Sequence, residues 1–400
     1  MERQRLLLLL PRSAYRAGPF IAAATRLGVE LVVGTDHATT LPGSRTLEFP
    51  FANPDRCVEQ IGEFADSQPL DAVFGVDERT SLVAAAASQT LGLRGNPPSA
   101  VALLHDKLHF RRWLTETGGR TPSYVSIHPH ECTPPETGYP WILKPRSLSA
   151  SRGVIRADDP EMFSDAVRAM HQHSGRSRSQ EPWGIAETYI PGAEVALEGV
   201  LVDGVLHTLA LFDKPDVSTG PTFAETIYVA PSRLPDALQR ACHDEVQLLV
   251  QKLGLTTGPL HAELRVNEQG CWLIEAAARP IGGQCASVLK FNGGTSHEYL
   301  LLGQAIGAPV HELTRECAAI GILMLTIDRV GTLMRIEGTE AARNITAIED
   351  ISITLPVGRA VAPLPWGDPY LGFVFAKGAT PDTVEDALRI AKRTIQPVIE

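Results

Sequence analysis

The sequence lacks the marks of a membrane, secreted or nucleic-acid-binding protein. No apolar run approaches the roughly 18 residues that a membrane-spanning helix needs, and the run at residues 6–10 ends at Pro11, which is too short for the core of a signal peptide. The six cysteines are scattered without a C-x-x-C pair, so we expect neither a zinc site nor a disulfide framework, and a cytoplasmic location fits. Lys and Arg number 36 against 46 Asp and Glu, for a net charge of −10, which argues against a nucleic-acid or membrane-surface partner.

What the chain does contain is an ordinary globular composition spread over 400 residues. Hydrophobic residues make up 44% and charged residues 20%, which excludes a disordered, collagen-like or coiled-coil protein. At roughly 150 residues per domain, the length predicts two or three domains. We expect a multi-domain protein of α/β and α+β class, divided into residues 1–95, 96–310 and 311–400.

The first of these units alternates short apolar strands with helices. Strands are expected at 5–10, 30–34 and 71–76, and helices at 19–27, 54–68 and 78–91. That alternation is typical of a parallel sheet with helices on its faces. The turn after the first strand, residues 11–18, has a single glycine, so the G-x-G-x-x-G cradle of dinucleotide-binding domains is absent. We therefore expect a Rossmann-like unit that binds a dinucleotide poorly.

The rest of the chain predicts mixed helices and strands. Helices are expected up to His105, up to Trp113, and at 160–173 and 236–253, with strands at 123–127 and 140–145 and in the stretches 185–212 and 261–279. The segments 129–140 and 176–182 are rich in proline or polar residues and are expected to be loops. Near the end, short strands at 319–327, 333–336, 352–355 and 370–376 precede a helix at 382–395 with one apolar face. This pattern predicts a smaller α+β unit.

Two glutamates in the stretch 261–279 are candidate metal ligands. Glu263 lies in the first expected strand and Glu275 in the second, and side chains alternate between the two faces of a strand. A two-residue turn would pair residue 267 with 270 and send the glutamates to opposite faces, whereas a three-residue loop would place them directly opposite each other. We favour the three-residue loop, because Gly270 would supply the left-handed conformation that such a loop needs.

Two facing carboxylates repel each other, so a shared proton or a cation must offset the repulsion. Oxygen ligands with room for phosphate suit Mg²⁺, which takes one or two protein carboxylates together with phosphate oxygens. The alternative is a pair of solvated glutamates on an exposed hairpin, the ordinary environment of this residue type. The apolar neighbours favour burial instead, and a buried carboxylate needs a partner.

A candidate anion site follows the apolar strand at 140–145, which ends in Lys144 and a proline. The next residues are small or hydroxylated and include Ser149, Ser151 and Gly153. A loop of this kind exposes N–H and hydroxyl groups that can surround a phosphate, and Lys144 would add a point charge to the same anion. A flexible hairpin with a surface lysine is the alternative.

Taken in order, these segments resemble the ATP-grasp superfamily, and within it the ADP-forming L-amino-acid ligases, which synthesise dipeptides. The resemblance covers roughly residues 1–400 in domain layout, and its specific motifs lie between Lys107 and Gly283. It implies an ATP-grasp fold in residues 96–310, with a small ATP-binding lobe at about 120–190. It also implies ATP with Mg²⁺ or Mn²⁺ as cofactors, small-molecule amino-acid substrates, and compatibility with a homodimer.

The resemblance also implies roles for individual residues. The nucleotide positions are Lys107 and Lys144 at the phosphates, Ser149, Ser151 and Gly153 in the covering loop, Glu187, Thr188 and Ile190 at the adenine hinge, and Glu194 at the ribose. The metal positions are Glu263 and Glu275, and the substrate positions are Glu225, Tyr228, Arg279, Gly282 and Gly283. Arg279 and Lys144 would be the catalytic groups.

Two positions depart from the family pattern. The family often has E-x-N after the second strand, with the Asn as a further metal ligand, and this chain has Ala277 there. One metal ion would then be held less firmly, or one ion would suffice. The loop after Lys144 has serine and alanine where many relatives have glycine, so we expect it to be stiffer or less ordered than theirs.

The implied reaction is an ATP-dependent ligation of a carboxylate to an amine. The carboxylate attacks the γ-phosphate to give an acyl phosphate and ADP, and the amine then displaces phosphate to form an amide, as in a dipeptide. Both reacting partners of the first step are anions, so neutralisation of charge dominates. Two alternatives stay open at this point: a carboxylase-type ATP-grasp enzyme that uses bicarbonate, and a nucleotide-binding regulatory protein without chemistry.

Overall fold

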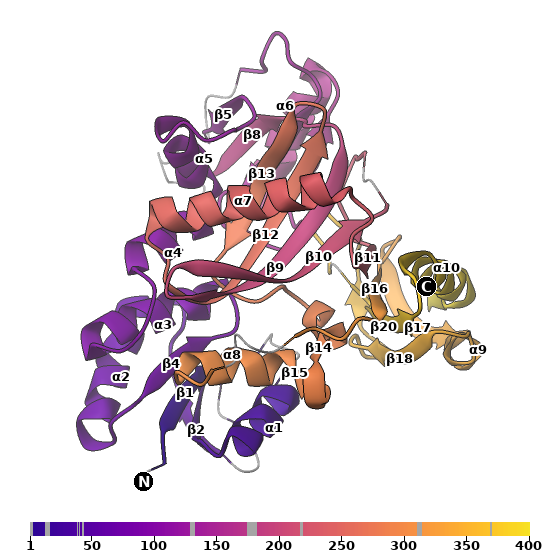
Figure 1. Cartoon of the computed structure of the whole chain (residues 1–400). Coiled ribbons are helices and arrows are strands. Elements are labelled where there is room, and N and C mark those ends of the chain that lie inside the picture. Colours follow the sequence, from indigo (N-terminus) through magenta and orange to yellow (C-terminus); the bar gives the residue numbers. More distant parts are fainter. Residues whose placement is uncertain are drawn as a thin grey trace.

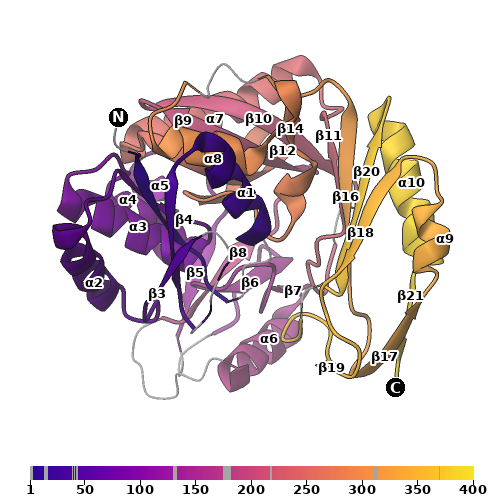
Figure 2. The same ribbon diagram turned by 90° about the horizontal axis from the view of Figure 1, so that it is seen from below.

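The computed structural model describes residues 3–12, 17–37, 39, 41, 44–128, 133–173, 182–216, 219–309, 314–368 and 370–400. The predicted loops at 129–140 and 176–182 lie partly or largely outside these ranges. In Figures 1 and 2 the N-terminal helices and the C-terminal strands lie at opposite ends of the molecule, and a second, small sheet lies above them in Figure 1. The expected multi-domain fold with several sheets is confirmed.

The N-terminal unit is built on a four-stranded parallel sheet in the order β3-β2-β1-β4. Its elements are β1 (Arg5–Leu9), α1 (Ala17–Leu27), β2 (Glu30–Thr35), β3 (Arg45–Glu48), α2 (Pro54–Ser67), β4 (Ala72–Gly75) and α3 (Glu78–Leu91). The sequence predicts all of them except β3, a four-residue edge strand without a buried residue and therefore without an apolar pattern. At the start of α3, the Asp77 carboxylate accepts the Thr80 N–H in a capping box, which fixes Glu78 on the first turn.

The small lobe is a four-stranded antiparallel sheet covered by one helix. The strands are β5 (Tyr124–Ile127), β6 (Trp141–Pro145), β7 (Ile155–Ala157) and β8 (Gly184–Thr188) in the order β5-β8-β6-β7, and the helix is α6 (Pro160–His173). The ring of Trp141 meets the ring of Phe163 edge-on at 6.5 Å between centroids, which fixes α6 on the sheet. Two short helices, α4 (Pro98–His105) and α5 (Lys107–Glu116), lead into this lobe.

The central sheet has eight strands in the order β13-β12-β9-β10-β11-β16-β20-β18. Its first five members are β9 (Ala193–Val202), β10 (Val205–Lys214), β11 (Ile227–Ala230), β12 (Thr257–Asn267) and β13 (Gly270–Ala277). Helix α7 (Asp236–Leu253) crosses one face of it (Figure 1), and buries Val246 and Leu249. The other elements here are α8 (His297–Ala305) and the short pair β14 (Lys290–Phe291) and β15 (Thr295–Ser296).

The C-terminal strands continue the central sheet instead of forming a sheet wholly of their own. β16 (Ala319–Leu325) pairs with β11 on one side and with β20 (Gly372–Gly378) on the other, and β18 (Ile348–Ile353) completes the edge. Every residue of β16 is buried, as expected of an interior strand. A three-stranded sheet of β17 (Gly331–Glu337), β19 (Ala360–Val361) and β21 (Gln396–Ile399), with α9 (Thr339–Arg343) and α10 (Pro381–Thr394), completes this part.

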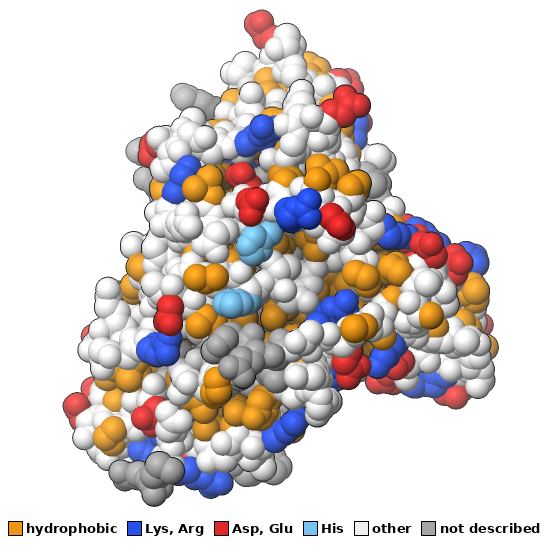
Figure 3. All heavy atoms as spheres, viewed as in Figure 1, with side chains coloured by type: hydrophobic (Ala, Val, Ile, Leu, Met, Phe, Trp, Pro, Cys, Tyr) orange, Lys and Arg blue, Asp and Glu red, His pale blue; other side chains and the backbone are white. Residues whose placement is uncertain are grey.

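The surface carries both acidic and basic side chains, as the composition of the chain indicates. On the face shown in Figure 3, acidic and basic side chains are interspersed and not gathered by sign. Within the described ranges, no helix combines the length and the apolar character needed to cross a membrane. The five cysteines in the described ranges are free, and four of them are buried, as expected from the lack of paired spacings.

Candidate active site

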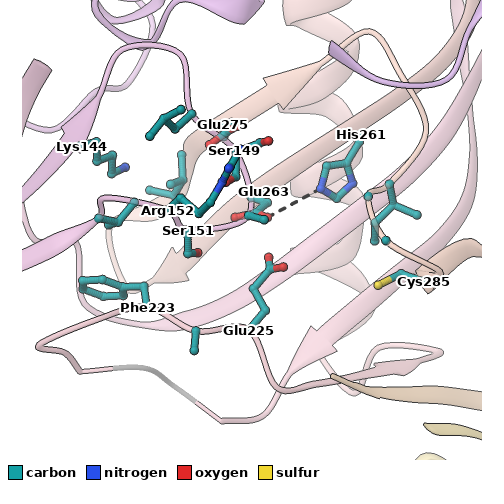
Figure 4. Close-up of a pocket in the computed structure, with 18 of the residues that line it drawn as sticks. Lys144, Ser149, Ser151, Arg152, Phe223, Glu225, His261, Glu263, Glu275 and Cys285 are labelled. Carbon is teal, nitrogen blue, oxygen red and sulfur yellow. Dashed lines mark hydrogen bonds and ion pairs between the residues drawn. The ribbon is translucent and has the colours of Figure 1, made fainter. Parts of the chain in front are cut away.

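A cavity of about 960 Å³ lies where the N-terminal unit, the small lobe, the central sheet and the C-terminal segment meet. Fifteen of the sixteen residues that the sequence analysis singled out line it: Lys107, Lys144, Ser149, Ser151, Glu187, Thr188, Ile190, Glu194, Glu225, Tyr228, Glu263, Glu275, Arg279, Gly282 and Gly283. Figure 4 shows Lys144, Glu225, Glu263 and Glu275 around this space, together with Ser149 and Ser151 of the loop after Lys144, called the serine loop below. The sixteenth, Gly153, is not part of the lining, and its N–H donates to the carbonyl of Pro365 at 2.7 Å.

The hairpin of β12 and β13 brings the two predicted metal ligands together, but not by the predicted loop. Asn267 pairs with Gly270 across a two-residue turn, so the three-residue loop is wrong. A β-bulge follows at Ile274, because Leu264 pairs with Leu273 and Glu263 with Glu275. The extra residue shifts the register by one and thereby restores the face-to-face arrangement of the two glutamates.

Cations surround this carboxylate pair. The Glu263 carboxylate lies 3.5 Å from Lys214 Nζ and 3.7 Å from His261 Nε2 (dashed in Figure 4). Burial favours the neutral acid, but Lys214 and His261 outweigh it and hold the pKa of Glu263 well below its ordinary value. Glu275 Oε2 lies 3.6 Å from Lys107 Nζ. Glu263 is therefore ionised at neutral pH, as a metal ligand must be.

The donor set fits a hard divalent cation that also binds phosphate. The carboxylates of Glu263 and Glu275 face each other. Within the described ranges, no group of three or more His, Cys, Asp or Glu side chains is arranged to hold a metal ion. Mg²⁺ commonly takes few protein carboxylates and completes its shell with water and phosphate oxygens. Ala277, opposite His261 on the neighbouring strand, adds no ligand.

Lys144 is held by a buried ion-pair cluster. Its Nζ lies 2.7 Å from Glu187 Oε2, and Arg111 Nε donates to Glu187 Oε1 at 2.6 Å. Glu187 is 3% exposed and Arg111 1% exposed. Burial alone would raise the pKa of Glu187, but Arg111 and Lys144 lower it to about 2. The Glu187 side chain therefore orients the lysine, and its neighbours Thr188 and Ile190 lie at the cavity wall.

This cluster predicts an acid-sensitive contribution to stability. The pKa of Glu187 is lower in the folded state than its ordinary value of 4.5, so the ionised side chain stabilises the fold fully at pH values above 4.5. This contribution is lost as the pH falls toward about 2. We expect Glu187→Gln to lower the melting temperature at neutral pH, because Arg111 and Lys144 lose their counter-charge. We also expect it to flatten the fall of melting temperature between pH 5 and pH 2.

Thermal unfolding followed by circular dichroism across that pH range measures both effects. Glu161→Gln, an exposed glutamate on α6, is the matched control and should follow the wild type. Identical slopes for Glu187→Gln and the wild type would contradict the assignment.

The serine loop is fixed at one end by Lys107. Lys107 Nζ donates to the carbonyl of Leu148 at 2.8 Å while it faces Glu275, so one side chain links the loop to the carboxylate pair. Ala150 and Ser151 have φ of 55° and 54°, a left-handed conformation that is uncommon for residues other than glycine. The loop thus takes a tight bend at two residues that are not glycine.

The sequence analysis missed a second lysine that lies at the end of a strand. Lys214, at the end of β10, contacts the Glu194 carboxylate and lies 3.4 Å from Glu225 and 3.5 Å from Glu263. Burial opposes its charge, but the three carboxylates raise the pKa of Lys214 above its ordinary value. The signal was present: Lys214 ends an apolar strand and precedes a proline, as Lys144 does.

Glu194 and Glu225 lie on either side of Lys214. Glu194 Oε2 also accepts from Arg265 Nη2 at 2.6 Å, so its carboxylate is fixed at the cavity wall. Glu225 accepts from the hydroxyls of Tyr228 and Tyr370, the latter at 2.7 Å. Tyr370 comes from the C-terminal segment, which therefore supplies part of the wall near the predicted amino-acid pocket.

Arg279 is held by a residue of the N-terminal unit. Its Nη2 lies 2.8 Å from Glu78 Oε1, and Nη1 donates to the Pro280 carbonyl at 2.9 Å. Burial would raise the pKa of Glu78, but Arg279 and Lys107 lower it to about 2. Beyond Arg279, the Ile281 N–H donates to the fully buried carboxylate of Glu198 at 3.1 Å, which anchors the turn that carries Gly282 and Gly283.

Three family models match successive parts of the chain. They are the ATP-grasp N-terminal domain at residues 21–95, the ATP-grasp domain at residues 137–288, and the L-amino acid ligase C-terminal domain 2 at residues 323–400. With the carboxylate pair and the lysines in one cavity between two lobes, these matches show that the chain belongs to the ATP-grasp superfamily. The crystal structure of an L-amino acid ligase from Bacillus licheniformis shares the fold, with a TM-score of 0.84 over 100% of both chains at 23% identity.

Two further proteins are similar to parts or all of the chain. An alanine–anticapsin ligase from Bacillus amyloliquefaciens is 26% identical over 270 residues, which cover 62% of this chain and 56% of that protein. The aligned part thus spans little more than half the length of this curated relative. The biotin carboxylase domain of a Hydrogenobacter thermophilus 2-oxoglutarate carboxylase, solved with MgADP and bicarbonate, has a TM-score of 0.67 over 100% of this chain and 92% of that chain at 16% identity.

Proposed function

We propose that the protein is an ATP-dependent carboxylate–amine ligase that joins two amino acids into a dipeptide and releases ADP and phosphate. The observation that carries this proposal is the convergence of Lys107, Lys144, Lys214 and Arg279 with two facing glutamates in one cavity. Such a set of fixed charges suits a reaction in which one anion attacks another. The likeness to L-amino acid ligases in the C-terminal segment supports amino acids as substrates.

The residues of the cavity have different roles in binding the nucleotide and the metal ion. Lys107, Lys144 and the loop with Ser149 and Ser151 bind the triphosphate, while the chain around Thr188 and Ile190 meets the base and Glu194 meets the ribose. Glu263 and Glu275 would hold Mg²⁺ or Mn²⁺, and the bound ion would neutralise negative charge on the phosphates.

Covalent change occurs in two steps. An oxygen of the substrate carboxylate bonds to the γ-phosphorus, and the bond between that phosphorus and the bridging oxygen breaks with its electrons going to ADP. The amine nitrogen then bonds to the acyl carbon, loses a proton, and expels phosphate. Arg279 holds the transferred phosphate in both steps, and the N–H groups near Gly282 and Gly283 receive the amino-acid carboxylate. Glu225 and Tyr228 form the side of the amino-acid pocket.

The bicarbonate-using alternative has less support from the site. Residues Thr354, Leu355, Arg359, Asp368 and Tyr370 of the C-terminal segment line the same cavity, and they lie within the part that matches the L-amino acid ligase C-terminal domain. A wall formed by five residues of this segment suits an amino acid with its side chain better than the small bicarbonate anion. A cytoplasmic location and a homodimer stay predictions.

A phosphate-release screen tests the proposal. The protein is incubated with ATP and Mg²⁺ and with all pairs of the common L-amino acids, and phosphate is measured against samples that lack amino acid or contain bicarbonate. Phosphate that appears only with particular amino acids, together with a dipeptide mass, is the expected result. Release with bicarbonate alone would support the carboxylase-type alternative, and nucleotide binding without any release would support a regulatory protein.

A further inference from the structure

Arg111 is a deeply buried charged residue beside the cavity, and its guanidinium contacts two separate parts of the site. Arg111 is 1% exposed. Nε donates to the Glu187 carboxylate, while Nη1 donates to the Leu273 carbonyl at 2.9 Å and Nη2 to the Ile274 carbonyl. These contacts join α5 to β8 on one side and to β13 on the other.

The first contact fixes a lysine. Glu187 accepts from Lys144 with its second oxygen, so the position of Lys144 Nζ depends on a carboxylate that Arg111 holds from the opposite side. The guanidinium is planar and presents its donors in a rigid fork. A carboxylate held between such a fork and a lysine has little freedom to rotate.

The second contact fixes the bulge. Ile274 has no partner in the register of β12 and β13, and it is this extra residue that turns Glu275 toward Glu263. Arg111 binds the carbonyls of Ile274 and of the preceding residue, so it stabilises the irregular stretch of strand that precedes Glu275. Bulges need such support, because they interrupt the ladder of hydrogen bonds between strands.

The same helix also carries Lys107. Lys107 and Arg111 are four residues apart on α5 and therefore lie on one face of the helix. The Asp106 side chain caps the helix by accepting from the N–H groups of Leu108 and His109. One short helix thus contacts Glu275 through Lys107, the bulge through Arg111, and Lys144 through Arg111 and Glu187.

We propose that Arg111 is a positioning residue that sets the phosphate-binding Lys144 and the metal-binding Glu275 in a fixed relation to each other. This inference rests on the proposed function. It assigns Arg111 no contact with substrate; the residue acts through Glu187 on the nucleotide side and through the carbonyls of β13 on the metal side.

Arg111→Lys separates the two contacts, because an ammonium is a single point charge that stays with the Glu187 carboxylate and releases the carbonyls. We expect the Kd for Mn²⁺, titrated by its EPR signal at saturating ADP, to rise by about 10-fold or more, the scale found when groups behind a metal ligand are removed. The Kd for ADP measured in EDTA should change by less than about threefold, since loss of a factor of three is under 1 kcal/mol. Arg112→Lys, at an exposed neighbouring position, is the matched control and should change neither value.

Glu187→Gln tests the other contact and serves if Arg111→Lys does not fold. It should raise the Kd for ADP in EDTA by about 10-fold, as expected for loss of the partner that orients a charged group, with the Kd for Mn²⁺ changed by less than about threefold. A folded Arg111→Lys protein with wild-type Mn²⁺ affinity would overturn the inference, and so would equal losses of Mn²⁺ and ADP affinity in Glu187→Gln. Failure of the proposed function is distinct, because the wild type would then bind ADP and Mn²⁺ without ligating amino acids.

Discussion

Replacing Glu275 by glutamine is expected to lower the rate of ATP-dependent dipeptide formation by about 10²-fold or more, on the scale of a lost charge-stabilising group in an active site. The carboxylate faces Glu263 across the hairpin and Lys107 at 3.6 Å. Glutamine keeps the size of the side chain but removes a negative charge, so the site holds a divalent cation less tightly. The loss should diminish as the Mg²⁺ concentration is raised.

The measurement is the initial rate of phosphate release as a function of Mg²⁺ at saturating ATP and amino acids. Glu268→Gln is the matched control, because Glu268 lies exposed on the turn of the same hairpin. The control should behave as the wild type. Near-normal turnover of Glu275→Gln at ordinary Mg²⁺ concentrations would contradict the metal-binding role.

Replacing Arg279 by methionine is expected to lower kcat by about 10²- to 10³-fold with little change in the KM for ATP, since the residue stabilises charge on the transferred phosphate and not on bound ATP. The side chain is 11% exposed and pairs with Glu78 at 2.8 Å. Its removal also leaves the half-buried Glu78 carboxylate without its closest cation, which costs stability.

A double variant separates the two effects. Glu78→Gln combined with Arg279→Met removes the unpaired charge, so its melting temperature should recover relative to Arg279→Met while kcat stays low. Arg240→Met, at an exposed position on α7, is the control. Recovery of kcat in the double variant would show that Arg279 acts only as a structural partner of Glu78.

Part of the candidate site could be proposed from local signals in the sequence, and the remaining positions came from the resemblance to the ATP-grasp superfamily. Glu263 and Glu275 lie twelve residues apart on one hairpin, and Lys144 ends an apolar strand before a loop of small residues. The pairing of the glutamates was predicted correctly, but through the wrong turn. A bulge at Ile274 has the same effect on register as a longer loop, and nothing in the apolar pattern of β13 distinguishes the two.

The sequence did not predict the residues that support the site, because their contacts are distant in the chain. Arg111 reaches Glu187 and Leu273 across 76 and 162 residues, and Glu78 reaches Arg279 across 201 residues. Each of these has the local pattern of an ordinary charged residue on a helix. Their partners are known only once the helices α3 and α5 are packed against the central sheet.

The fold was predictable in class and in most of its elements, but not in how the last strands join. The alternation of strands and helices predicted the N-terminal parallel sheet, and the change of pattern near the end predicted a smaller α+β unit, without indicating how its strands join the rest. Pairing of β11 with β16 carries the central sheet into that segment. Strand order depends on contacts between distant segments, which periodicity within a strand does not encode.

Transfer of ¹⁸O from substrate to phosphate tests the central claim most directly. An amino acid labelled with ¹⁸O in both carboxylate oxygens is incubated with ATP, Mg²⁺ and an acceptor amino acid found in the screen, and the released phosphate is analysed by mass spectrometry. An acyl phosphate requires one carboxylate oxygen to leave with the phosphate, so one ¹⁸O per phosphate is the predicted result. Dipeptide accompanied by unlabelled phosphate would contradict the account.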